Sequence, residues 1–218
     1  MSGQFDAFHA LETEKKERII NAALDEIAQK GFKKASTNTI IKQAGISKGM
    51  LFYYFGSKED LFDFLCEYTI EFAKREYIEK FAKNIKTRDF IERCRALSEV
   101  KNYAMTHYPK IIKFYESSFL PSNSEYFSKY SDSIQEIYHA VRDGLYDNID
   151  YSLFRDGIAP EKTLVYIRWL TERYEKELTD KLIDEGGMQR WDVDAAFDDY
   201  YGFLADLRRA FYKDEKER

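Results

Sequence analysis

The residues best suited to chemistry lie in one short stretch, residues 44–62, which reads AGISKGMLFYYFGSKEDLF. A lysine ammonium can donate hydrogen bonds to guanine O6 or N7, and a tyrosine can pack against a thymine methyl group or donate to a phosphate. A glycine lets backbone approach a partner closely. Lys48, Gly49, Tyr53 and Lys58 therefore combine groups that suit the bases and the backbone of a DNA duplex.

The charge along the chain is uneven. The 218 residues carry a net charge of -5, which taken alone argues against nucleic acid. The segment between Ile27 and Lys58, however, holds six lysines and no acidic residue. A surface that meets phosphate has such an excess of positive charge. A solvated lysine face explains the charge equally well, so the charge alone decides nothing.

The helices before this stretch can be predicted from periodicity and capping residues. Apolar residues at helical spacing predict a helix from Glu12 to Lys30, which Gly31 ends. Ser36 stands where its hydroxyl can cap a second helix over residues 37–44.

A tight turn and a further helix come next. Gly45 can take the left-handed conformation that reverses the chain, and Ser47 can cap a helix over residues 48–55. Ser57 with Asp60 is typical of a capping box that starts a fourth helix. A helix in this setting fits the major groove while its partner helix braces it and touches the DNA backbone.

The remainder of the chain is also helical in pattern, so we predict an all-α fold. Helices are expected near residues 89–106, 110–119 and 124–148, with Pro109 and Pro121 between them. Pro160 suits the first turn of a long helix that the glycines at 186 and 187 stop, and Asp192 can cap a last helix that reaches Phe211.

Other classes of protein are less well supported by the sequence. Cys66 and Cys94 lack the spacing of a disulfide framework or a zinc site, and no apolar stretch approaches the length of a membrane span. Asp198 and Asp199 are adjacent, so on a helix their carboxylates diverge by about 100° and do not face one metal ion. We expect a cytoplasmic protein with no cofactor, no metal site and no enzymatic activity.

Residues 14–65, and above all the stretch 44–62, resemble the DNA-binding domain of the TetR family of transcriptional regulators. The usual pattern of that family is a glycine-turned helix-turn-helix followed by Leu-Tyr, two aromatic or histidine residues, Phe and Ser-Lys-Glu. The resemblance implies an N-terminal three-helix DNA-binding domain over residues 1–60 and a helical ligand-binding and dimerisation domain over residues 61–218.

The resemblance also implies which residues contact DNA. The expected set is Ser36, Asn38, Ser47, Lys48, Gly49, Met50, Tyr53, Tyr54 and Lys58. Three positions depart from the family pattern. Phe52 replaces a tyrosine that usually reaches phosphate, Thr39 replaces a frequent acidic residue, and Ile41 fills a position that is often small.

Family members are typically homodimers built on their last two long helices. Here the segments from Trp169 to Leu182 and from Phe197 to Phe211 have broad apolar faces, which either form a dimer interface or complete a monomer core. A symmetric dimer would bind a palindromic operator in double-stranded DNA.

Aromatic residues between 89 and 157 are numerous enough to line a cavity for a small effector, although a plain core uses the same residue types. The tentative ligand-binding set is Tyr103, His107, Phe114, Tyr115 and Tyr138. The resemblance favours a repressor that a small apolar or aromatic molecule releases from DNA. A constitutive DNA-binding dimer or an activator without an inducer remains the alternative.

Overall fold

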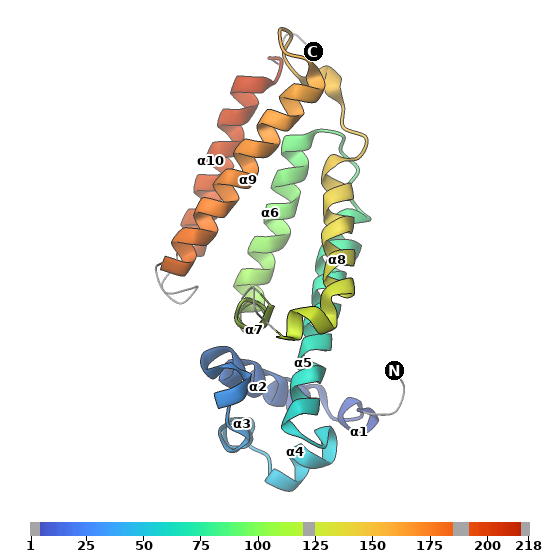
Figure 1. The fold of residues 1–218 in the computed structure, drawn as a ribbon, viewed down its shortest axis with the longest axis vertical. Coiled ribbons are helices and arrows are strands. Elements are labelled where there is room, and N and C mark those ends of the chain that lie inside the picture. The colour runs from blue at the N-terminus through green and yellow to red at the C-terminus, as the bar shows by residue number, and fades with distance from the viewer. Residues whose placement is uncertain (1–4, 120–124, 185–191, 215–218) are drawn as a thin grey trace. The chain divides into compact units, whose positions relative to one another are not determined.

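The computed structural model describes residues 5–119, 125–184 and 192–214. Within these ranges every element of regular structure is helical, as predicted (Figure 1). The elements, in chain order, are α1 (Asp6–His9), α2 (Thr13–Lys34), α3 (Thr37–Ala44), α4 (Lys48–Phe55), α5 (Lys58–Ala73), a π-helix (Lys74–Ala82), α6 (Phe90–His107), α7 (Pro109–Phe119), α8 (Glu125–Tyr146), a 3-10 turn (Tyr151–Leu153), α9 (Pro160–Asp184) and α10 (Val193–Phe211).

The chain divides into two compact units. The first unit comprises residues 1–75 and 108–137, and the second comprises residues 76–107 and 138–218. This division rests on packing. The resemblance implies a different boundary, between residues 60 and 61, for the DNA-binding domain. That functional boundary stays a prediction.

The first unit is built around α2. This helix packs against α3, α5 and α7, and its apolar stripe is buried as the periodicity predicts. Gly31 has a φ of 70° and breaks the regular helix where we expected it to end, but a further turn continues the element to Lys34. The largest fully buried side chains of this unit are Phe8, Ile19, Leu24, Ile27, Ile40, Leu51, Leu61, Phe62, Leu65 and Phe114.

The second unit contains α6, α9 and α10, which run side by side (Figure 1). Their shared core includes Phe90, Ile167, Leu204 and Tyr212. The hydroxyl of Tyr212 donates to Asp89 Oδ1 at 3.0 Å and thereby ties the end of α10 to the start of α6.

Most predicted helices appear with ends shifted by one or two residues. Pro160 opens α9, and Asp192 Oδ1 accepts the N–H of Ala195 at 3.0 Å and so caps α10. The sequence did not predict α1 or the π-helix that follows α5. Pro121 and the glycines at 186 and 187 lie outside the described residues.

Candidate nucleic-acid interface

The turn between α3 and α4 has the predicted construction. Gly45 has a φ of 66°, in the left-handed region that a residue without Cβ adopts at little cost. Ile40 and Ala44 from α3 and Leu51 and Phe55 from α4 are buried. The two helices therefore share one apolar junction, and the face of α4 that carries Lys48, Gly49 and Tyr53 stays exposed.

Each helix start in this region has its serine cap. Ser36 Oγ accepts the N–H of Thr39 at 3.4 Å and Ser47 Oγ accepts that of Met50 at 3.2 Å. Ser57 Oγ accepts the N–H of Asp60 at 3.0 Å and donates to its carboxylate at 2.6 Å. The caps confirm the predicted helix starts, and they mean that the hydroxyls of Ser36 and Ser47 are already engaged in local hydrogen bonds.

The outward face of α4 carries three of the predicted DNA contacts. Lys48 and Gly49 are exposed, and Tyr53 is 74% exposed. The ammonium of Lys48 lies 5.9 Å from the centroid of the Phe52 ring. Phe52 lacks the hydroxyl of the usual tyrosine, and in this chain its ring instead supports the lysine beside it.

Met50 and Asn38 complete the outward set at its edges. Met50 is half-buried on α4, while Asn38 is exposed in the first turn of α3. The lysines that precede the turn are exposed as well, namely Lys30, Lys33, Lys34 and Lys42. Positive charge therefore surrounds α3 and α4 within the first unit.

Tyr54 and Lys58 are placed differently from their neighbours. Tyr54 is half-buried, with its ring centroid 6.0 Å from that of Phe8. The ammonium of Lys58 donates to the carbonyl of Lys33 at 3.3 Å and lies 4.8 Å from the Phe32 ring centroid. Because an ammonium has three donors, the Lys33 contact leaves Lys58 able to bind phosphate.

Glu26 belongs to the site and was missed in the sequence. It is only 7% exposed, and its Oε1 accepts the backbone N–H of Ser36 at 3.0 Å. This bond fixes the start of α3 to the middle of α2. The available signal was an acidic residue within the buried stripe of α2, where the periodicity calls for an apolar one.

Ion pairs join α7 and the first part of α8 to other helices of the first unit. Lys110 on α7 pairs with Asp25 on α2 at 2.5 Å. On α8, Lys129 pairs with Asp63 of α5 at 2.6 Å, and the hydroxyl of Tyr130 donates to the same carboxylate at 3.2 Å. Burial, together with the nearby charge of Asp63, raises the pKa of Tyr130.

The predicted effector residues are divided between the two units. In the second unit, the rings of Tyr103 and His107 stack with centroids 4.2 Å apart, and Tyr138 is exposed. In the first unit, Phe114 is fully buried and packs on Phe62 at 5.7 Å, which is the arrangement of a core residue. Tyr115 is half-buried, 5.5 Å from the ring of Phe119.

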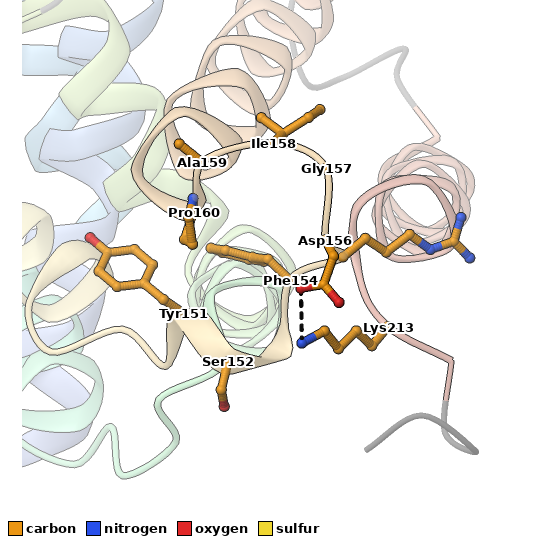
Figure 2. Close-up of a pocket in the computed structure, with 10 residues that line it drawn as sticks. Tyr151, Ser152, Phe154, Asp156, Gly157, Ile158, Ala159, Pro160 and Lys213 are labelled. Carbon is orange, nitrogen blue, oxygen red and sulfur yellow. Dashed lines mark ion pairs between the residues drawn. The ribbon is translucent and has the colours of Figure 1, made fainter.

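A pocket of about 510 Å³ lies in the second unit, away from all five of these residues. Residues 151, 152 and 154–160 line it together with Lys213, whose ammonium lies 3.4 Å from Asp156 (Figure 2). Among the described residues, no group of three or more histidine, cysteine and acidic side chains could hold a metal ion. In the same residues, no helix has the length and apolar character needed to cross a membrane.

An exposed apolar face follows α9. Trp169 is 57% exposed, and Tyr166 and Leu170 on the same helix are also exposed. On α10, by contrast, Tyr200, Leu204 and Leu207 are buried in the core of the second unit. Of the two apolar faces, that of α10 thus contributes these residues to the core, whereas that of α9 has apolar residues that stay exposed.

Comparison with known proteins identifies the helix-turn-helix. Residues 19–64 match the family model described as bacterial regulatory proteins, tetR family. The uncharacterized HTH-type transcriptional regulator YerO of Bacillus subtilis is 46% identical over 57 residues, which make up 26% of this chain and 20% of that protein. The fatty acid metabolism regulator protein of Bacillus subtilis is 30% identical over 88 residues, 40% of this chain and 43% of that protein. The chain thus matches less than half the length of either relative.

Likeness to solved structures extends over most of the chain at low identity. The crystal structure of the transcriptional regulator FadR from Bacillus subtilis in complex with stearoyl-CoA aligns with a TM-score of 0.54 and 19% identity. The alignment covers 88% of this chain and 95% of that one. At this identity the likeness shows a common fold.

Proposed function

We propose that this member of the TetR family of transcriptional regulators is a homodimeric repressor that binds a palindromic operator through α4 and leaves it when a small effector binds. The observation that carries the proposal is the exposed set Lys48, Gly49 and Tyr53 on the second helix of a capped helix-turn-helix. A helix of this width enters the major groove and presents such side chains to base edges.

The residues around α4 supply the contacts that carry no sequence information. Lys30, Lys33, Lys34 and Lys42 are exposed on neighbouring helices, where phosphates of a bound duplex would lie. Asn38, in the first turn of α3, can donate to the backbone or to a base edge. These contacts set the register of the protein, while Lys48 and Tyr53 read the sequence.

A homodimer is supported by the apolar face of α9. Exposed Trp169 sits next to Leu170 and one helical turn from Tyr166, and such a patch on a protein surface typically marks an interface. Two-fold symmetry would place two α4 helices about 34 to 36 Å apart on one side of the duplex. The operator would then have two inverted half-sites.

An apolar or aromatic effector is supported by the class of the related proteins. One relative is a fatty acid metabolism regulator, and the aligned FadR structure contains stearoyl-CoA. Tyr103, His107 and Tyr138 offer aromatic and hydrogen-bonding surface in the second unit. These residues suit a ligand that is mostly apolar with a polar end.

The route from effector to DNA would run through α7 and α8. Helix α7 and the part of α8 up to residue 137 belong to the first unit, and they are joined to α2 and α5 by the pairs Lys110–Asp25 and Lys129–Asp63. An effector that favours another placement of α7 or α8 would change the position of the DNA-binding helices and so shift the population away from the operator-bound state.

The proposed DNA binding can be tested in two steps. The protein first selects duplexes from a random-sequence pool, and its affinity for them is then measured by anisotropy titration at two salt concentrations. We expect palindromic, salt-sensitive binding that Lys48→Ala and Tyr53→Ala weaken. The matched variants Lys86→Ala and Tyr151→Ala remove an exposed lysine and an exposed tyrosine from the second unit and should bind as the wild type does. Wild-type protein that enriches no sequence would overturn the proposed function.

A constitutive DNA-binding dimer or an activator without an inducer is the second candidate. It is favoured by one observation: none of the five predicted effector residues lines the pocket at residues 151–160, and Phe114 is fully buried. Thermal unfolding with a panel of fatty acyl-CoA thioesters, free fatty acids and aromatic acids separates the two. A ligand that raises the midpoint of thermal unfolding and also weakens operator binding supports the repressor. If no stabilising ligand changes operator binding, the alternative is supported.

A further inference from the structure

Helix α1 lies outside residues 19–64, the stretch that matches the family model, yet it contacts α4. Helix α4 packs against three elements, which are α1, α3 and α5. From α1, Phe8 is only 1% exposed. A residue so deeply buried, in a helix of four residues, must be inserted into a neighbouring core.

That core is an aromatic cluster formed with α4 and α5. The Phe8 ring centroid lies 4.9 Å from that of Phe55, 5.1 Å from that of Phe64 and 6.0 Å from that of Tyr54. Phe5 extends the cluster, at 5.9 Å from Phe55 and 5.2 Å from Phe64. Rings at these distances attract one another beyond the area that they bury.

The segment that carries Phe8 is itself held in place. The N–H of His9 donates to the carbonyl of Phe5 at 2.9 Å, and the N–H of Leu11 donates to that of Phe8 at 3.1 Å. The ammonium of Lys16, in the first turns of α2, donates to the carbonyl of His9 at 3.2 Å. Phe8 is therefore fixed between the start of α2 and the back of α4.

Helix α4 needs such support because it has only eight residues and buries only two, Leu51 and Phe55. A helix of that length is not stable by itself in water, so packing determines its orientation. Without Phe8, Phe55 and Phe64 would lose an apolar neighbour, and the ring of Tyr54 would lose its contact on that side. The helix would then sample several orientations, of which few suit the groove.

We infer that Phe8 is a positioning residue for DNA recognition, which acts through Tyr54 and Phe55 and touches no nucleotide itself. The inference rests on the proposed function and deepens it, because it extends the DNA-reading unit to residues before the helix-turn-helix. It also gives Tyr54 a second role: this residue connects the aromatic cluster to the face of α4 on which Tyr53 is exposed.

The test uses the full-length protein and a duplex that the wild type enriches from a random pool. Phe8→Ala should weaken binding to that duplex by about tenfold, comparable to one mismatched base pair. The slope of affinity against salt should stay unchanged, because no phosphate contact is removed. Phe8→Leu keeps an apolar side chain and should retain most of the wild-type affinity. This variant keeps the test usable if Phe8→Ala does not fold.

The matched control is Phe72→Ala. Phe72 is another buried phenylalanine of the first unit, and its ring packs on Tyr108 of the α7 region at 4.9 Å, outside the cluster. The Phe72→Ala variant should lower the midpoint of thermal unfolding without a comparable loss of DNA affinity. Hydrogen exchange provides a reading without DNA: amides of residues 48–55 should exchange faster in Phe8→Ala, and those of residues 109–119 should not.

A double-mutant cycle completes the test. If Phe8 acts through Tyr54, the combined loss of Phe8→Ala and Tyr54→Ala is smaller than the product of the two single losses. Multiplicative losses, an unchanged affinity in Phe8→Ala, or an equal loss in Phe72→Ala overturn the inference while the proposed function stands. Wild-type protein that selects no duplex overturns the proposed function instead.

Discussion

The carboxylate of Glu26, which is only 7% exposed, accepts a hydrogen bond from the backbone N–H of the half-buried Ser36 at 3.0 Å. Ser36 in turn caps α3. One buried acidic side chain thus joins the middle of α2 to the residue that caps α3.

Replacing Glu26 by alanine should lower the free energy of unfolding by about 2 kcal/mol, because the N–H of Ser36 loses a charged acceptor. Glu26→Gln keeps an acceptor oxygen and should lose less. Chemical denaturation followed by circular dichroism measures both. The exposed Glu17 on the same helix provides the control, since Glu17→Ala should change little. Equal effects at the two positions would show that the Ser36 bond contributes nothing.

Replacing Gly49 by alanine should separate stability from DNA binding. A Cβ at Gly49 would have only Ser47 Oγ near it, at 4.0 Å, so the fold accepts the methyl group. The helix should gain about 1 kcal/mol, while operator affinity should fall if backbone approaches DNA here. Gly202→Ala, an exposed helical glycine of α10, is the control: it should give a similar gain with affinity and sedimentation unchanged. Tighter binding by Gly49→Ala would exclude close approach at Gly49.

The local features of this chain were predictable because they depend on adjacent residues. Gly45, Ser47 and Asp192 act within one turn of their own position, and each does what its residue type suggests. The positions that were missed, Phe8 and Glu26, gain their meaning from residues distant in sequence. No local pattern predicts that Phe8 packs beside Phe64 or that Glu26 accepts a hydrogen bond from Ser36.

The residues predicted to bind an effector also depend on contacts with residues distant in sequence, and were harder to predict. Tyr103 and Phe114 look alike in the sequence, as aromatics on helical stripes, yet Tyr103 is exposed and Phe114 is fully buried. Whether such a ring lines a cavity depends on which helix lies opposite. The π-helix Lys74–Ala82 is another case: Glu76 pairs with Lys80 at 2.7 Å at ordinary helical spacing, but that it is only 1% exposed depends on the elements packed around it and not on the local pattern.

Trp169→Glu should convert a dimer into a monomer. The indole is more than half exposed on α9, and a carboxylate at this position would be paired with its own copy or buried at a symmetric interface. Sedimentation velocity measures the assembly, and anisotropy should show affinity for a full palindrome falling toward that for a half-site. Tyr151→Glu places the same charge on an exposed aromatic of the loop before α9 and should stay dimeric. A dimeric Trp169→Glu would exclude this face of α9 as the interface.

Glu116 on α7 should make the fold less stable at neutral pH than an uncharged residue would. Burial raises the pKa of this carboxyl above its usual value of 4.5, and the charge of Lys113 only partly opposes the effect. The unfolded chain therefore releases its proton at a lower pH than the folded one does, and stability declines as pH rises from about 4.5 through the higher folded pKa.

Glu116→Gln removes this titration. Its unfolding midpoint should exceed that of the wild type at pH 7, and the difference should vanish below about pH 4.5. Glu71→Gln, which replaces an exposed carboxylate on α5, serves as the control in the same titration. A gain for Glu116→Gln that persists at pH 4 would mean that packing of the amide, and not loss of the buried charge, stabilises the variant.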